Sequence, residues 1–184
     1  MTVKEIIKLV CEFVGEREIL SKLDDVDATF TDYEQEKLDV LVKCFNLVNQ
    51  EIATDYIPLL LKEEVSEEKI LFSSLSKTLV NVYEVKNRFG MNLKFKLFSD
   101  YVEVESVPKS IIYSFLPENL TLNDIVDCNP RINARVYAYG IASEFLLIYG
   151  ISENAEIWED RFKTSLFILN KKNGKCVLPK RSWR

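Results

Sequence analysis

The chain has 184 residues, enough to bury one sizeable core and too few for two ordinary domains to be expected. Hydrophobic residues make up 47% and charged residues 29%, which is typical of a globular protein and excludes a disordered or fibrous one. Histidine is absent, which removes the commonest general base and every Ser–His or Cys–His nucleophile pair. The composition therefore predicts a protein that is not an enzyme.

The cysteines lie far apart in the sequence, at Cys11, Cys44, Cys128 and Cys176. No C-x-x-C pair occurs, so the spacings of zinc ribbons and thioredoxin-like sites are missing. In a reducing cytosol we expect the first three to be small buried hydrophobic residues. No cofactor and no metal is predicted. The apolar runs are too short to span a bilayer and the first residues lack a cleavable apolar block, so we expect synthesis in the cytosol and no membrane partner.

The formal net charge of −5 hides a steep gradient along the chain. All 29 acidic residues lie at or before Asp160, so residues 1–160 carry a net charge of −13 and residues 161–184 carry +8. An acidic body with a basic end predicts that the end contacts something negative. The partner would be either a nucleic acid or the acidic surface of another protein.

The first segment is predicted to be a helical hairpin. Thr2 and Glu5 fit a capping box, and apolar residues then recur with a period near 3.6 residues. Gly15 should weaken this first helix locally, while Glu18 and Lys22 could support a last turn.

A second capping box, Thr31 with Glu34, starts the other helix of this hairpin. Pro58 should end or kink that helix near Tyr56, because the residue before a proline avoids the helical conformation. The link between the two helices also has oxygen-bearing residues at the spacing of a calcium loop: Asp25, Asp27, Thr29, Thr31 and Glu36. Such a loop needs glycine at its sixth position, where Phe30 stands, so a solvated acidic turn is the favoured interpretation.

From about Ile70 to Phe115 the hydrophobic period changes to two residues, which predicts three or four short antiparallel strands. Residues 87–90 form a turn with glycine at its end, and residues 99–100 form another tight connection. The strands have half-polar faces. One side of the sheet should therefore pack on the helices, and the other should face water or a neighbouring subunit.

After the sheet, Thr121 and Asp124 can cap one helical turn, and Asn129–Pro130 is predicted to start a long helix that Gly150 ends. Small residues at helical spacing predict that this helix is central and the most buried; they are Ala134, Ala138, Gly140 and Ala142. Ser152 should cap a second, antiparallel helix. The residues predicted to face inward from it are Ile157, Trp158, Phe162, Leu166 and Leu169, with Glu159 and Lys163 facing outward.

Residues 171–184 contain six basic residues and no acid, and they lack a helical period, so we expect an extended tail. A purely disordered tail would seldom keep the apolar pair Val177–Leu178 and Trp183. The combination predicts a docking strand that becomes ordered on a partner, with apolar anchors for affinity and basic residues for orientation.

Catalytic motifs are scarce. Paired carboxylates occur at residues 63–64, 67–68 and 159–160, and solvated surfaces explain them better than acid–base catalysis does. No phosphate-binding glycine motif is present. An enzyme with a carboxylate-based site is the least favoured alternative. Tyrosines of the long helix are predicted to be core or interface residues and not a ligand box: Tyr137, Tyr139 and Tyr149.

The order of helices, sheet and closing helical hairpin, followed by a basic tail, resembles the head–tail connector (adaptor) proteins of tailed bacteriophages. The strongest match is residues 134–162, an alanine-rich helix that ends in glycine and is followed by an A-E-x-W-x-x-R-F/Y run at residues 155–162. The end, LPKRSW at residues 178–183, resembles the arginine-plus-tryptophan terminus of the family. Residues 44–60 also match, so the resemblance covers most of the chain loosely.

The resemblance implies a structural virion protein at the head–tail junction, present in the host cytoplasm during assembly. Such adaptors form a ring, commonly of twelve copies, below the portal; they extend the DNA channel and join head to tail. The implied partners are the portal protein, further copies of the chain, a downstream tail or connector protein, and phage DNA that passes without specific binding. The implied portal-binding residues are Lys171, Lys172, Lys175, Val177, Leu178, Lys180, Arg181, Trp183 and Arg184.

The predicted fold is α+β and mainly α, with N- and C-terminal helical hairpins packed together, a small inserted antiparallel sheet and an extended C-terminal tail. Residues 1–170 are expected to form a single domain, and residues 171–184 the docking arm. Within that domain the helical parts are residues 1–60 and 120–170, and the β insertion is residues 66–116. The alternative function is a nucleic-acid-binding accessory protein for packaging or regulation that uses the basic arm. It is less favoured because DNA would repel the acidic body.

Overall fold

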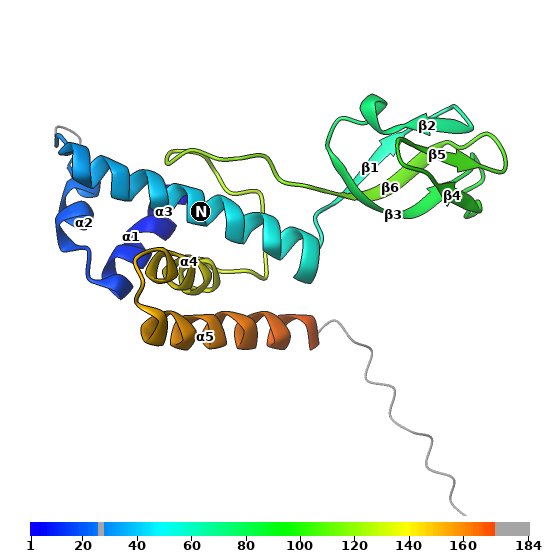
Figure 1. The fold of residues 1–184 in the computed structure, drawn as a ribbon. Helices are drawn as coiled ribbons and strands as arrows, with labels where there is room; N and C mark the ends of the chain where they lie inside the picture. Colours follow the sequence, from blue (N-terminus) through cyan, green and yellow to red (C-terminus); the bar gives the residue numbers. More distant parts are fainter. Residues whose placement is uncertain (26–27, 172–184) are drawn as a thin grey trace, which may run out of the picture.

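The structure is a computed structural model that describes residues 1–25 and 28–171, except for the side chain of Lys171. The fold of these residues is α+β and mainly α, as predicted (Figure 1). Its α-helices are α1 (Val3–Val14), α2 (Arg17–Asp24), α3 (Asp32–Glu51), α4 (Ala134–Ile148) and α5 (Ser152–Lys171). Its strands are β1 (Leu60–Glu64), β2 (Lys69–Leu71), β3 (Leu79–Lys86), β4 (Phe95–Leu97), β5 (Tyr101–Val104) and β6 (Ser110–Phe115). Among the described residues, none of the helices has the length and apolar character needed to cross a membrane.

The first capping box forms as predicted at the start of α1. The backbone N–H of Thr2 donates to the Glu5 carboxylate at 2.8 Å, and the N–H of Glu5 donates to the Thr2 hydroxyl at 3.2 Å. Gly15 does more than weaken the helix. It adopts φ 82°, donates its N–H to the carbonyl of Cys11 and ends α1, so that residues 17–24 form the separate helix α2.

The second capping box also forms, and α3 begins directly after Thr31. The last helical turn of this segment, residues 52–56, is a π-helix, η1, and it ends at Tyr56 as predicted. Ile57, which precedes Pro58, has the extended angles φ −135° and ψ 91°. The chain therefore leaves the helices in an extended conformation and enters the first strand.

The β portion begins earlier than predicted, because residues 60–64 form strand β1, which pairs with β6 from Leu60 opposite Ser114 to Glu64 opposite Ser110. The described residues form six strands and not three or four. They make two antiparallel sheets, with strand orders β1-β6-β3 and β2-β5-β4. The sequence of β1, LLKEE, lacks a full apolar–polar alternation, which is why its strand character was missed.

We name residues 58–116 the β module. Its buried side chains form a cluster of their own that includes Ile70, Val85, Val102 and Ile111. Within the described residues, no buried member of this cluster comes from an α-helix. The prediction that one side of the sheet packs on the helices is therefore wrong: the sheets bury their apolar faces within the module. The chain enters at β1 and leaves at β6, which are paired neighbours, so the module projects from the helices on two adjacent strands (Figure 1).

We name residues 1–57 and 117–171 the helical body. After β6 the chain returns through residues 117–133, which run beside α3 (Figure 1). The side chain of Asn46 holds this return segment by donating to the carbonyl of Leu120 at 3.0 Å and accepting from its N–H at 2.8 Å. The hydroxyl and N–H of Thr121 bond the carboxylate of Asp124, so the predicted capping pair forms within a turn.

Asn129–Pro130 does not start the long helix, which corrects the prediction. The amide oxygen of Asn129 accepts from the N–H of Arg131 at 3.1 Å and makes a turn. Asn133 is the actual N-cap of α4, and its side chain accepts from the N–H of Val136 at 3.2 Å. Two asparagines four residues apart both suit a cap, and the turn at the first one leaves the cap to the second.

Helix α4 packs against α1, α3 and α5, so the long helix is central, as predicted. Gly140 marks the closest approach: a Cβ atom there would lie 2.9 Å from the Cγ1 of Val48 and 3.0 Å from the ring of Phe162. Gly150 follows α4 with φ 76°, the left-handed conformation expected at this position.

The thiols of Cys11 and Cys44 are fully buried in the core of the helical body, as predicted. Burial raises the pKa of each thiol to about 12, so neither is a reactive thiolate near neutral pH. Cys128, which was also predicted to be buried, is only half-buried, although it packs against the same core.

Candidate interaction surfaces

The predicted docking arm lies outside the described residues, so the positions of Lys172, Lys175, Val177, Leu178, Lys180, Arg181, Trp183 and Arg184 are not described. Lys171 is the last residue of α5. Helix α5 is therefore the described element from which the arm continues, and its surface is the first place to look for partner contacts.

The inner face of α5 packs on α4. Phe162 and Leu166 are buried and Trp158 and Leu169 are half-buried against the core, as predicted. Ile157 is 53% exposed, so its predicted inward position is wrong. It lies five residues before Phe162, which at about 100° per residue places it on the far side of the helix.

We name the exposed residues Glu153, Glu156, Ile157, Asp160 and Ile168 the α5 outer face. Two of them are isoleucines, 53% and 49% exposed, and the other three are carboxylates. Helix α5 begins with acidic residues and ends with basic ones, which suits its dipole. The outer face thus combines apolar side chains with negative charge, and the exposed cation of Arg161 lies one turn after Ile157 on the same side of the helix.

A second exposed apolar surface lies in the β module, in residues 85–99, which we name the β3–β4 hairpin. Phe89 is 70% and Met91 58% exposed, and Leu97 and Phe98 are exposed as well. The hairpin has four basic residues and no acidic residue: Lys86, Arg88, Lys94 and Lys96. The guanidinium of Arg88 lies 4.7 Å from the centre of the Phe89 ring. The positive charge is partly offset, because Lys86 pairs with Glu84 at 2.5 Å and Lys94 lies 3.8 Å from Glu105.

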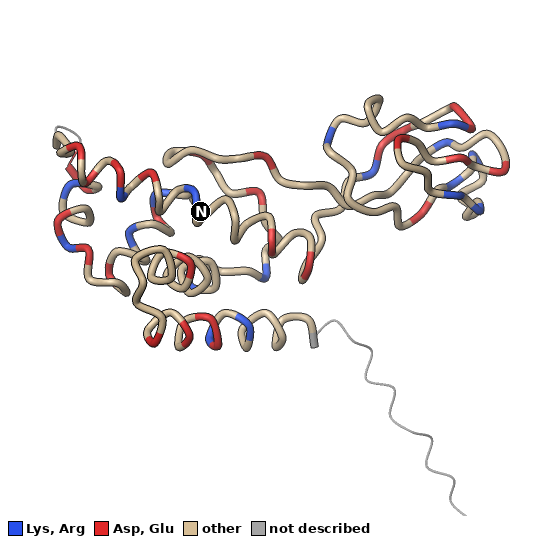
Figure 2. Tube along the Cα trace, viewed as in Figure 1, with Lys and Arg blue, Asp and Glu red and all other residues tan. Residues whose placement is uncertain are grey.

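The two parts of the molecule differ in charge. The β module has eight acidic and eight basic residues, whereas the helical body has 21 acidic and 11 basic residues, a net charge of −10. Figure 2 shows acidic positions (red) spread along the helices and acidic and basic positions (blue) mixed in the β module. The negative charge predicted for residues 1–160 is therefore concentrated in the helical body.

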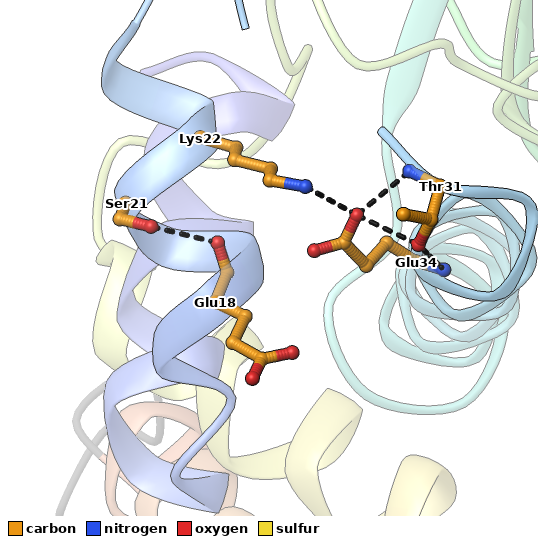
Figure 3. A network of polar contacts seen from close by, with 5 residues as sticks. All are labelled: Glu18, Ser21, Lys22, Thr31 and Glu34. Carbon is orange, nitrogen blue, oxygen red and sulfur yellow. Dashed lines mark hydrogen bonds and ion pairs between the residues drawn. The ribbon is translucent and has the colours of Figure 1, made fainter. Parts of the chain in front are cut away.

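The best-connected polar cluster joins α2 to the start of α3 (Figure 3). The carboxylate of Glu34, only 7% exposed, accepts from the ammonium of Lys22 at 2.5 Å and from the N–H and hydroxyl of Thr31 at 2.7 and 2.8 Å. The hydrogen bond from Lys22 and those from Thr31 lower the pKa of this carboxyl to about 2. Of the residues at the spacing of a calcium loop, Thr31 thus uses its hydroxyl to bond Glu34.

Another carboxylate, Glu63 on β1, is half-buried. The prediction that it lies on a solvated surface is therefore wrong. It accepts hydrogen bonds from the hydroxyl of the fully buried Tyr113 and from the hydroxyl and N–H of Ser76. Burial raises the pKa of this carboxyl, but the hydrogen bonds outweigh burial and leave it below its usual value. Ionised Glu63 therefore ties the segment after η2 (Phe72–Ser74) to β1 and β6, a structural role.

The three tyrosines of the long helix have different environments. Tyr137 is buried and donates to the amide oxygen of Asn49 at 3.0 Å, and Tyr139 stacks with Phe13 and Trp158. Tyr149 is 41% exposed just past the end of α4. Tyr137 and Tyr139 are thus core residues, as predicted.

A depression of about 550 Å³ lies on the β2-β5-β4 sheet. Its lining mixes three lysines with three glutamates around Phe95 and Val104. Along one row across the sheet, Lys69 and Lys96 flank Glu103, so neighbouring charges offset one another. In the described ranges 1–25 and 28–171, no group of three or more cysteines and carboxylates is placed to hold a metal ion.

Comparison with models of known protein families gives no match, and comparison with curated proteins gives none either. The surfaces themselves are therefore the basis for a functional interpretation. The β3–β4 hairpin was missed by sequence reasoning, although a signal was present: fifteen consecutive residues with four basic side chains, several large apolar ones and no acid.

Proposed function

We propose that the protein is a head–tail adaptor of a tailed bacteriophage, a structural virion protein that forms a ring below the portal and joins head to tail. The observation that carries the proposal is the polarity of the chain: a helical body with a net charge of −10 continues, through α5, into a basic arm that bears a tryptophan. In this proposal the arm docks on the portal. The outer surfaces of the body and the β module meet neighbouring copies and the downstream tail or connector protein.

The charge of the helical body supports the role of a DNA conduit. A wall that repels phosphates lets DNA pass without being retained, whereas a basic wall would bind it. The basic residues of the last segment would then serve for contact with an acidic protein surface. The proposed protein has no catalytic step and needs no cofactor; it acts in the virion after assembly in the host cytoplasm.

The test is co-assembly with the portal protein encoded in the same genome. Mass photometry of the mixture should show a portal complex enlarged by a ring of this chain. A variant that ends at Lys171 keeps every described helix and strand and should lose that complex, while its circular dichroism spectrum stays that of a folded protein. A full-length control with the arm residues in scrambled order separates the loss of the docking sequence from the loss of charge.

Unchanged docking of the variant that ends at Lys171 would contradict the proposal. So would retention of the full chain on duplex DNA at low salt with affinity that falls steeply as salt rises, because that behaviour defines the nucleic-acid-binding alternative.

A further inference from the structure

We propose that the β module turns as a rigid body relative to the helical body, about a pivot formed by residues 57–59 and 116–118, and that the ion pair between Lys77 and Glu118 holds one of its orientations. This motion is a conformational device of the fold itself. It does not depend on the portal, on DNA or on association of copies, so it goes beyond the function proposed above.

The two parts of the molecule have separate cores, as such a motion requires. Among the described residues, each extensive contact between elements joins two helices or two strands, and no buried residue of the module's cluster comes from a helix. The entering and leaving segments run between the module and the helices (Figure 1). Parts of a chain that share no large apolar interface are expected to move relative to each other.

Backbone hydrogen bonds fix both ends of the entering segment. On the body side, the N–H of Ile57 donates to the carbonyl of Ile52 at 2.8 Å, which closes the π-helix η1. On the module side, the carbonyl of Leu59 accepts from the N–H of Phe115 at 3.1 Å. Pro58 stands between these bonds and has no N–H to donate. Rotation is therefore confined to the few torsions around Pro58, beside a π-helix, a feature that often marks functional sites.

The leaving segment is built in the same way. In the module, the N–H of Leu116 donates to the carbonyl of Thr78 at 2.9 Å. In the body, the side chain of Asn119 accepts from that of Gln50 at 3.2 Å. Pro117 lies between the two anchored residues. Because β1 and β6 are paired neighbours, the two crossings lie side by side, and one axis through both lets the module swing without breaking a sheet.

Leu59 packs on both parts and marks the pivot. Its side chain packs against the core of the module and also lines a narrow gap between body residues that include Ile57 and Ile132. Apolar contacts are non-directional, so Leu59 can roll against these neighbours while it stays covered.

An ion pair spans Pro117 and fixes the leaving segment in one orientation. The ammonium of Lys77, in the module, lies 2.5 Å from the carboxylate of Glu118. Within the ranges 1–25 and 28–171, this pair is the one ion pair or side-chain hydrogen bond that joins module and body. Its side chains are 39% and 72% exposed, and an exposed pair favours its bound geometry by no more than about fivefold. The pair is therefore a weak latch, which opens easily.

The experiment measures distances between two spin labels in the full chain by pulsed electron paramagnetic resonance. A ketone-bearing amino acid carries each label, so the native cysteines stay in place. One pair of labels crosses the pivot, from the exposed Leu47 in α3 to the exposed Tyr83 in β3. Control pairs lie within one part: Leu47 with Ile125 in the body, and Tyr83 with Val107 in the module. We expect the crossing pair to give a distance distribution at least about twice as wide as either control.

Variants separate the latch from the pivot. Lys77→Gln should raise the ratio of molecules outside the main distance to those within it by about two- to fivefold, and high salt should act in the same direction. Lys77→Glu together with Glu118→Lys should restore the original ratio. Lys62→Gln, at an exposed lysine of β1, is the matched control and should leave it unchanged. Pro58→Gly frees the φ angle of the entering segment and should widen the crossing distribution while both controls stay narrow.

A crossing pair as narrow as the controls, in the original chain and in Pro58→Gly alike, would overturn the rigid-body motion. A module control as wide as the crossing pair would overturn it too, because the module itself would then deform. An unchanged ratio in Lys77→Gln would contradict the role of the ion pair. None of these measurements involves the portal. A failure here therefore leaves the adaptor function standing, and a failure of portal docking leaves the pivot standing.

Discussion

The helical body and the β module are folded in different ways although one chain forms both. The body collects its core from distant segments: Val3, Leu41, Val136 and Leu166 lie in one buried cluster. Among the described residues, the buried cluster of the β module draws only on its own stretch of the chain. An insertion with its own core can take on a different charge and a different surface without disturbing the body. We therefore expect two cooperative units.

The largest effect should come from Phe45→Ala in the helical body. Phe45 is fully buried, and its ring lies 5.8 Å from that of Tyr137. Removing it should lower the free energy of unfolding of the body by about 3–5 kcal/mol. Urea unfolding followed by circular dichroism measures the loss, with Leu47→Ala on the exposed side of α3 as the control. Hydrogen exchange at β6 amides should stay slow; a parallel loss of protection there would show that the two parts unfold together.

The reciprocal change is Ile111→Ala in β6, which empties the fully buried centre of the β module. We expect a loss of about 2–5 kcal/mol confined to the module, seen as faster amide exchange in β1, β3 and β6. Tyr83→Ala on the exposed side of β3 is the control. If α4 amides exchange faster to the same extent, the separation of the two cores is wrong.

A smaller effect is expected from Gly140→Ala at the centre of the body. The added methyl group gains about 1 kcal/mol of helix propensity but collides with Val48 and Phe162, and overpacking costs about 1–3 kcal/mol. The net result should be a destabilisation of roughly 1 kcal/mol, measured by thermal unfolding. Val48→Ala in the same chain makes room for the added methyl group. The double variant should therefore lose less stability than the sum of the losses of the two single variants. Simple additivity would contradict the close approach.

The smallest effect concerns Glu34→Gln at the edge of the body. The folded state holds the pKa of Glu34 near 2, below its ordinary value of 4.5. The stability that the carboxylate contributes is therefore fully present above about pH 4.5 and is lost as the pH falls toward 2. The variant should be less stable at neutral pH and should show a flatter dependence of melting temperature on pH in that window. Glu36→Gln, exposed on the same helix, should keep the original slope.

Local signals in the sequence predicted the ends of helices well. The capping boxes at Thr2 and Thr31, the stop before Pro58 and the left-handed Gly150 each depend on a few neighbouring residues, and each lies as expected. The cap at Asn129 failed because Asn133 offers the same side chain one turn later. Where two nearby residues could both cap a helix, tertiary packing decides between them, and packing cannot be deduced from the local sequence.

Long-range pairing and surface function were harder to predict. Strand β1 has the composition of an exposed segment, and only its pairing with β6 makes it a strand. The mutual burial of the two sheets likewise depends on partners distant in sequence. For the interaction surfaces, the sequence pattern predicted residues 171–184 but did not predict the hairpin around Phe89. Phe89 falls in the turn predicted at residues 87–90, and the exposure of its ring shows only in the structure.

The β module is connected to the helical body through the adjacent strands β1 and β6, and this connection determines how the module can be replaced. Since Leu60 and Ser114 are direct neighbours across the ladder, the intervening segment is a cassette whose ends already meet. A short loop could replace the whole cassette without moving α3 or the return segment, and a different cassette could be grafted at the same two points. Replacing the β module would thus change which neighbouring molecules the protein contacts and leave the helical body unchanged.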